Sequence, residues 1–373
     1  MIDYNFTETS FGLNLYCLSL YLFVIIFTTG RVVRYHKIQR KDNLEYLLLL
    51  GGFMLFLISS FINADFFSYQ GYVRGFSKQE MGYMGVLDYL ILYVIGRNFI
   101  IFRMFVWWGA LFLVLHTNKR FKGDNFLVAY SLFAMFLLEF SYARATLAMA
   151  VYFYGLSFLC IPLKRWEKLS TLLGLSIILF SYTFHRSMAF LIVATPFVFI
   201  TINKKNLIIL LLLFPVAVGW LSELFFSTID NQTISDELIM GKLEGYSDRD
   251  WTEELNLKGL FLTWINYITI YAMVIVGAIL AVGKKGKNLP TSYIRFIKIS
   301  IIIVLIASLF LFIDIPNDIF YYRILIMAVI PITLFFCYLY SKRLISNTIF
   351  LGLLFIRVGY HLVRLSYYVT SYW

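Results

Sequence analysis

The chain has 373 residues, of which 61% are hydrophobic and only 14% are charged, and its formal net charge is +11. A soluble domain carries roughly 25% charged residues, so this composition excludes a water-soluble globular protein. Apolar stretches of about 16 to 22 residues recur along the chain, close to the roughly 20 residues with which a helix crosses a bilayer. Because lipid offers no hydrogen-bond partners, these stretches must be helices that satisfy their own backbone groups.

The predicted fold class is all-α, a polytopic integral membrane protein with a single membrane domain over residues 1–373. About twelve transmembrane helices are expected, within a range of 11–13. In chain order the predicted spans are 11–29, 44–62, 98–116, 124–142, 145–163, 170–184, 187–202, 206–226, 260–282, 298–313, 323–341 and 346–363. The apolar stretch 82–96 is expected to be a re-entrant or interfacial helix, because counting it as a crossing would invert every later loop.

The distribution of positive charge predicts the orientation. Twenty of the 32 Lys and Arg residues fall in alternate loops: Arg31, Arg34, Lys37, Arg40, Lys41, Lys119, Arg120, Lys122, Lys164, Arg165, Lys168, Lys204, Lys205, Lys284, Lys285, Lys287, Arg295, Lys298, Lys342 and Arg343. Cytoplasmic loops carry the Lys/Arg excess, so both termini are predicted to lie outside. The net charge is then a topological signal, and it does not indicate a nucleic-acid partner, since no soluble domain carries a basic stripe.

Two long loops are predicted on the outer face, 63–81 and 227–259, and they are expected to face the substrate. Three arginines, Arg144, Arg186 and Arg323, stand at predicted outer helix ends with little loop around them. The planar guanidinium binds phosphate oxygens in pairs and stays charged, which suits a pyrophosphate at the level of the lipid headgroups. The alternative for each arginine is that it extends from a helix end to the interface without binding a ligand.

Two residues on the predicted outer face could accept a proton from a sugar hydroxyl. His185 has an ordinary pKa near ~6.5, and the carboxylate of Asp65 could serve in the same way if partly buried. The alternatives are a helix-capping histidine and an exposed loop acid. Glu139 lies inside a predicted span, where a carboxylate is costly unless paired, and Arg144 is a candidate partner five residues away.

Motifs for cofactor binding are absent from the sequence. There is no GxGxxG, P-loop, HExxH or Cys/His metal cluster, and the short basic loops on the predicted cytoplasmic side offer no room for a nucleotide site. We therefore expect no cofactor and no metal, and we expect chemistry at the outer face to use a lipid-linked donor or a gradient.

Four motifs resemble those of a bacterial family, the EpsG-type (Wzy-like) polymerases of exopolysaccharide, capsule and O-antigen. They are Asp65-x-x-Ser68-Tyr69-x-x-Tyr72 with Glu80-x-Gly82-Tyr83, Arg144-Ala145-Thr146-Leu147-Ala148, Phe184-His185-Arg186-Ser187 and Tyr321-Tyr322-Arg323. The family usually has a glutamine near the first of these arginines, where this chain has Thr146. It usually has a small residue after the histidine, where this chain has Arg186.

The resemblance implies a GT-C-like bundle in the bacterial cytoplasmic (inner) membrane, and glycosyl transfer from an undecaprenyl-pyrophosphate-linked glycan to another lipid-linked repeat unit. On this interpretation Arg144, Arg186 and Arg323 bind the pyrophosphate, and His185 or Asp65 is the catalytic base. Contacts with the acceptor glycan are expected from Tyr69, Tyr72, Glu80 and Asp318. The expected partners are lipid-linked repeat units, membrane lipid, and a flippase and chain-length regulator of the same pathway.

Two other functions compete with polymerisation. A transporter or flippase of the same lipid-linked glycan also needs cations at the outer face, and Glu139 and Glu223 could line its ion path. Repeated halves and broken midplane helices are typical of transporters, and the sequence shows neither. A membrane acyltransferase that modifies glycans could use His185 as its base, but it would need a route for the acyl donor.

Overall fold

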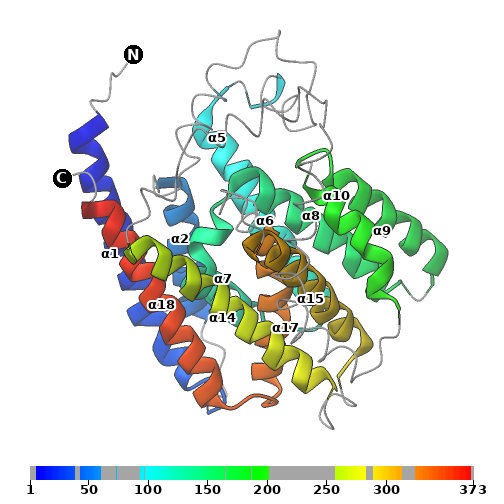
Figure 1. The fold of residues 1–373 in the computed structure, drawn as a ribbon. Helices are drawn as coiled ribbons and strands as arrows, with labels where there is room; N and C mark the ends of the chain where they lie inside the picture. The colour runs from blue at the N-terminus through cyan, green and yellow to red at the C-terminus, as the bar shows by residue number, and fades with distance from the viewer. Residues whose placement is uncertain are drawn as a thin grey trace, which may run out of the picture. The chain divides into compact units, whose positions relative to one another are not determined.

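The computed structural model describes residues 6–37, 43–59, 73, 93–95, 97–163, 165–185, 187–200, 257–282, 289–312 and 324–370. All regular structure among these residues is helical. The chain divides into two compact units, of which unit 1 comprises residues 1–192 and 333–373, and unit 2 comprises residues 193–332; Figure 1 labels the helices along the chain. The prediction of one membrane domain over 1–373 stays a prediction.

Unit 1 contains most of the described helices, and their bounds lie close to the predicted spans. They are α1 (Phe6–Val33), α2 (Asn43–Ser59), α5 (Phe99–Arg103), the π-helix η2 (Met104–Trp108), α6 (Gly109–Arg120), α7 (Asn125–Phe140), α8 (Ala143–Cys160), α9 (Glu167–Ser181) and α18 (Asn347–Thr370). The greater parts of α10 (Met188–Ala194) and α17 (Val329–Ser341) also belong to this unit. Helices α5, η2 and α6 form one continuous rod, because the residues at their junctions keep helical φ and ψ.

Unit 2 contains the 3-10 helix η3 (Thr195–Val198), α14 (Leu257–Val282) and α15 (Thr291–Phe312). The Tyr267 hydroxyl on α14 lies 2.7 Å from the Ser308 hydroxyl on α15, a hydrogen bond between two apolar helices. The Lys298 ammonium donates to the carbonyl of Ile200 at 2.6 Å. The predicted span 206–226 and the predicted outer loop 227–259, apart from its last residues, lie outside the described residues.

The basic loops of unit 1 meet at one end of the helices. The Tyr35 hydroxyl, after α1, donates to Asp124 Oδ2 at 2.8 Å, between α6 and α7. Arg120 Nη2 donates to the Ile161 carbonyl after α8 at 2.8 Å, and Arg343, after α17, donates to the His36 carbonyl at 3.1 Å. Within the described part of unit 1, the loops that the charge pattern grouped on one side therefore lie together. We call this the basic end.

Burial and the Asp124 carboxylate raise the pKa of Tyr35 well above its ordinary value. The hydroxyl of Tyr35 therefore stays protonated and donates to that carboxylate. This bond ties the turn after α1 to the start of α7.

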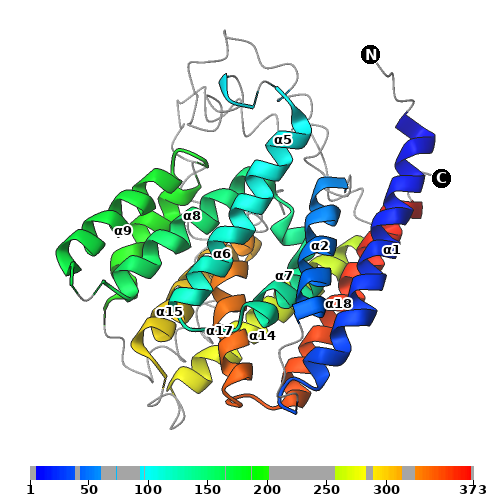
Figure 2. The same ribbon diagram turned by 180° about the vertical axis from the view of Figure 1, so that it is seen from behind.

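The opposite end of unit 1 holds the remaining helix ends, and we call it the distal end. Helices α1 and α18 lie side by side, with the start of α1 next to the end of α18 (Figures 1 and 2). Helix α2 begins at the basic end, where Glu45 pairs with Arg31 at 3.4 Å. The rod α5–η2–α6 ends at the basic end, at Arg120. The end of α2 and the start of α5 therefore lie at the distal end, as the prediction for 82–96 requires, although that stretch itself is described only at 93–95.

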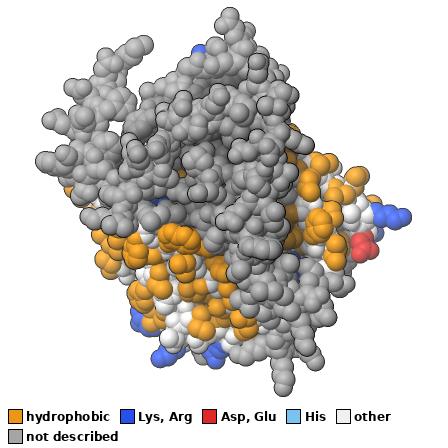
Figure 3. Space-filling model, in the orientation of Figure 1, with side chains coloured by type: hydrophobic (Ala, Val, Ile, Leu, Met, Phe, Trp, Pro, Cys, Tyr) orange, Lys and Arg blue, Asp and Glu red, His pale blue; other side chains and the backbone are white. Residues whose placement is uncertain are grey.

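The surface of the described helices is strongly apolar. On α9, Leu169, Leu172 and Leu179 are 55%, 62% and 59% exposed, and hydrophobic side chains cover most of the described surface in Figure 3. Such surface is unfavourable in water and suits lipid. By length and composition, five of the described helices could cross a membrane: Leu15–Val33, Phe99–Arg120, Thr291–Ser308, Ile324–Ser341 and Asn347–Ser366. The chain is thus a helical membrane protein, while the count of twelve spans and the GT-C-like arrangement stay predictions.

Candidate functional site

The turn between α7 and α8 lies at the distal end and is held by hydrogen bonds on both sides. The Ser141 hydroxyl donates to the Leu138 carbonyl at 2.6 Å, and the Thr146 hydroxyl donates to the Phe140 carbonyl at 2.9 Å. From η2, Trp107 Nε1 donates to the Ser141 carbonyl at 3.1 Å. These bonds give side-chain partners to carbonyls at the end of α7, where the helix itself supplies few; the Leu138 carbonyl also accepts the Ser141 amide at 3.2 Å. Thr146, where the family usually has glutamine, therefore has a structural role in the turn.

Arg144 follows this turn directly and is the second residue of α8. Its side chain is half-buried. The first amides of a helix carry the positive end of its dipole and favour anions. A guanidinium in the same turn adds a full positive charge at that place, so the start of α8 combines two features that attract a phosphate group.

His185 lies just before α10 and contacts Ser187 through one ring nitrogen. The backbone amide of Ser187 donates to His185 Nδ1 at 3.3 Å, and the Ser187 hydroxyl lies within hydrogen-bonding distance of the same atom. The His185 carbonyl accepts the Met188 amide at 3.0 Å. Because an amide can only donate, Nδ1 is an acceptor and the ring proton of the neutral form sits on Nε2. The capping alternative considered for this histidine is therefore realised at Nδ1.

The packing of α8 against α9 brings Arg144 and His185 to the same end of unit 1. The two helices cross closely at Gly155 and Gly174. At 1.5 Å per residue, Arg144 lies about 16 Å along α8 from this crossing, and the end of α9 lies about 10 Å along α9 in the same direction. The Tyr152 hydroxyl of α8 donates to the Leu191 carbonyl of α10 at 3.0 Å, which keeps α10 beside the same part of α8.

The other predicted site residues lie outside the described residues. They are Asp65, Tyr69, Tyr72, Glu80, Arg186, Asp318 and Arg323. Their roles stay predictions, as does the substrate-facing role of the outer loops 63–81 and 227–259.

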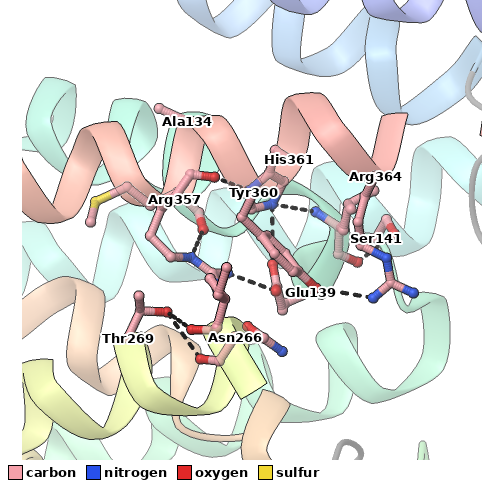
Figure 4. A network of polar contacts seen from close by, with 12 residues as sticks. Ala134, Glu139, Ser141, Asn266, Thr269, Arg357, Tyr360, His361 and Arg364 are labelled. Carbon is pink, nitrogen blue, oxygen red and sulfur yellow. Dashed lines mark hydrogen bonds and ion pairs between the residues drawn. The ribbon is translucent and has the colours of Figure 1, made fainter. Parts of the chain in front are cut away.

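A buried cluster of ionisable side chains joins α7 to α18. Arg357 Nη2 lies 2.6 Å from Glu139 Oε1, and His361 Nε2 lies 3.2 Å from Glu139 Oε2. The side chains of all three residues are 0% exposed. Figure 4 shows Glu139 between these two partners from α18. The Glu139 carboxylate, for which sequence reasoning considered Arg144, thus contacts Arg357 and His361.

Further along α18, the cluster continues toward the distal end. Arg364 Nη1 donates to the Tyr360 hydroxyl at 3.0 Å, and the Arg357 guanidinium lies 4.8 Å from the centre of the Tyr360 ring. Arg357 and His361 fall within the predicted span 346–363, but nothing in the sequence connected them to Glu139. The signal that could have found them is the spacing 357, 361 and 364, which puts three basic side chains on one face of a helix.

The described residues contain no group of three or more His, Cys, Asp or Glu side chains that could hold a metal ion. The expectation of a reaction without metal or cofactor is not tested by this observation.

A comparison with protein families matches residues 44–372 to a family model described as the EpsG family. The chain belongs to the EpsG family. The matched range contains Glu139, Arg144 and His185, as well as Arg357 and His361 on α18. Neither the curated proteins nor the solved structures that were searched gave a match.

Membership in the EpsG family confirms the resemblance drawn from the four motifs. It indicates a polymerase of polysaccharide biosynthesis, in keeping with the apolar helices of unit 1.

Proposed function

We propose that this EpsG protein polymerises glycan repeat units linked to a lipid pyrophosphate, at the distal end of unit 1. The observation that carries the proposal is the placement of Arg144 and His185 together at the end opposite the basic loops. Under the positive-inside rule the basic end is cytoplasmic. The distal end then faces outward, at the headgroup level where a lipid pyrophosphate lies, and both termini lie on that side of the bacterial cytoplasmic membrane.

The reaction is a glycosyl transfer. A hydroxyl oxygen of the acceptor sugar attacks the anomeric carbon of the donor, the bond from that carbon to the pyrophosphate oxygen breaks, and the lipid pyrophosphate leaves. Negative charge builds on the leaving group, and fixed cations near it stabilise the transition state. Arg144 at the start of α8 supplies such a charge, and Arg186 and Arg323 are proposed to add to it.

The geometry of His185 favours a particular role. With Nδ1 accepting from Ser187, the proton of the neutral ring is on Nε2, and we propose that it is donated to an oxygen of the pyrophosphate when substrate binds. The hydroxyl proton of the acceptor then goes to the other candidate base, Asp65. Tyr69, Tyr72, Glu80 and Asp318 are proposed to contact the acceptor glycan.

The experiment uses the purified full-length protein, a lipid-pyrophosphate-linked repeat unit, and a gel that resolves chain length. A ladder of oligomers formed without added nucleotide is expected from the wild type, and a loss of at least tenfold in yield from Arg144→Ala. Lys122→Ala is the matched control, because it removes one exposed cation from the basic end. Unchanged ladder length and yield in Arg144→Ala would contradict the proposed role of this arginine.

The same preparation separates polymerase from flippase. Reconstituted in proteoliposomes, a flippase moves the lipid-linked unit between leaflets and forms no ladder. That result would replace the polymerase proposal and make Arg144 part of a binding gate. If the protein is a flippase, Glu139 is not a free ion-path residue, since its carboxylate is bound by Arg357.

A further inference from the structure

Helix α7 has an internal kink near its distal end. Phe136 has φ −139° and ψ 23°, outside the helical range, while the helix continues to Phe140. A kink of this kind interrupts the ladder in which each amide bonds the carbonyl four residues earlier. Buried backbone groups released in this way need other partners. All residues of α7 from Phe126 to Phe140 are buried, so water is not available to them.

Side chains from two neighbouring helices bond the backbone groups around the kink. In a regular helix the Leu138 amide would bond the Ala134 carbonyl. Here the Leu138 amide donates to His361 Nε2 at 3.3 Å, and the Ala134 carbonyl accepts from the Tyr21 hydroxyl of α1 at 2.9 Å. The Met135 carbonyl accepts from Arg357 Nε at 2.7 Å. The kink is thus stabilised by α1 and α18.

Of the two α18 residues that bond this backbone, Arg357 also binds the Glu139 carboxylate. His361 Nε2, which accepts the Leu138 amide, lies 3.2 Å from Glu139 Oε2. Arg357 therefore contacts α7 on both sides of Phe136, through Nε at Met135 and through Nη2 at Glu139. The buried ion pair with Glu139 keeps the Arg357 side chain in this position, because moving the guanidinium away would leave a buried carboxylate uncompensated. We call Glu139, Arg357 and His361 the kink clamp.

The kink clamp lies directly before the turn that carries Arg144. The Leu138 and Phe140 carbonyls accept the hydroxyls of Ser141 and Thr146. The backbone position of residues 138–140 therefore sets the turn and the first helical turn of α8. A displacement of about 1 Å in a group that positions substrate can cost roughly 100-fold in rate.

We propose that Glu139, Arg357 and His361 are positioning residues, which hold the kink of α7 so that Arg144 stands where it can bind a phosphate group; the binding part rests on the proposed function. None of the three touches the substrate in this proposal. They act through the α7–α8 turn.

The clamp itself is tested by hydrogen–deuterium exchange of the full-length protein in detergent. Arg357→Met is expected to raise the exchange rate of residues 136–146 at least tenfold and to leave the centre of α9 within twofold. The control Glu45→Gln disrupts the ion pair with Arg31 at the basic end and should change neither region. Wild-type exchange over 136–146 in Arg357→Met, or an equal increase throughout unit 1, would overturn the clamp.

A second variant covers the case in which the single change prevents folding. Glu139→Leu with Arg357→Met removes both charges and keeps apolar volume, a replacement that buried ion pairs often tolerate. This double variant still lacks the bond to the Met135 carbonyl. It is therefore expected to fold and to show the same local increase in exchange over 136–146, and wild-type exchange there would overturn the clamp.

Positioning of Arg144 is tested by the binding of a short-chain prenyl pyrophosphate. Arg144→Ala and Arg357→Met are each expected to weaken binding at least tenfold. The combination of Arg144→Ala with Arg357→Met is expected to bind within twofold of Arg144→Ala alone, because both changes act through the Arg144 guanidinium. Independent, multiplying losses would overturn the positioning role. Binding that Arg144→Ala leaves unchanged would refute the phosphate-binding role of Arg144, and the clamp would then be judged by exchange alone.

Discussion

At the residue scale, the two ring nitrogens of neutral His185 differ in protonation. Nδ1 accepts the Ser187 amide at 3.3 Å and caps the start of α10, whereas Nε2 carries the proton in the neutral form. A substitution can therefore separate the two functions. The amide oxygen of asparagine can take the place of Nδ1, but its side chain ends short of Nε2.

We expect His185→Asn to preserve folding and to lower polymer yield at least tenfold, because the cap is kept and the Nε2 donor is lost. His185→Ala is expected to lose both the cap, with a cost of about 0.5–2 kcal/mol in unfolding free energy, and the yield. The measurements are thermal unfolding in detergent and the ladder assay. Wild-type yield from His185→Asn would show that this histidine is a cap alone.

The buried pair Glu139–Arg357 allows an energetic prediction at the same scale. Arg357→Met is expected to lower the free energy of unfolding by about 3–5 kcal/mol, since it leaves a buried carboxylate with less compensation. The double change with Glu139→Leu is expected to cost less than the sum of the two single changes. Titration with SDS in mixed micelles measures all three values.

Glu45→Gln at the basic end is the control for this double-mutant cycle of Glu139→Leu and Arg357→Met. The Arg31 and Glu45 side chains are 10% and 34% exposed, so Glu45→Gln should lower the free energy of unfolding by less than about 1 kcal/mol. Additive losses in the Glu139–Arg357 cycle would mean that the two side chains do not interact in the folded protein.

At the element scale, the crossing of α8 and α9 depends on two glycines. A Cβ on Gly155 would lie 2.9 Å from both the Gly174 carbonyl oxygen and the Ile178 amide nitrogen. Both contacts are backbone atoms, which cannot move aside as a flexible side chain can. Small residues at helix crossings in membranes let backbones approach closely, and this crossing sets the alignment of Arg144 with the loop of His185.

We expect Gly155→Ala to lower the free energy of unfolding by about 1–3 kcal/mol, the usual cost of overpacking, and to reduce polymer yield by shifting α9 along α8. Gly352→Ala on α18 is the matched control, because a Cβ there meets nothing within 4 Å. That change should be neutral or stabilising by up to about 1 kcal/mol, since alanine is the better helix former. SDS titration compares the two variants, and equal effects would contradict the close crossing.

At the scale of the whole molecule, the topology follows from charge and can be measured directly. The basic end of unit 1 is expected in the cytoplasm and the distal end outside. The native cysteines Cys17 and Cys337 are buried, so they should contribute little background, and Cys160 can be replaced by serine.

In intact cells, a membrane-impermeant maleimide is expected to label Tyr182→Cys, which is exposed at the distal end. Lys122→Cys at the basic end should be labelled only after the membrane is permeabilised. The reverse pattern would invert the orientation and place Arg144 and His185 at the cytoplasmic side, where a lipid-pyrophosphate donor delivered outside could not reach them.

Much of the fold follows from the sequence because bilayer crossing is a local requirement. Predicted spans such as 124–142 and 346–363 differ by a few residues from α7 and from α18, which extends to Thr370. The differences occur at the ends, where capping by residues such as Asp124 and the length of a helix beyond the apolar core decide the bounds. The grouping of the basic loops at one end was also predictable, because consecutive membrane-spanning helices put alternate loops on the same side.

The sequence by itself determined the class of protein, the approximate bounds of the described helices, the grouping of the basic loops at one end of unit 1 and, through four motifs, the family. Only the tertiary structure decided that Glu139 pairs with Arg357 and that α18 bonds the kink of α7. The physical reason is separation along the chain. Hydropathy and charge act within one helix or loop, whereas a buried carboxylate 218 residues from its guanidinium finds its partner only when the helices pack.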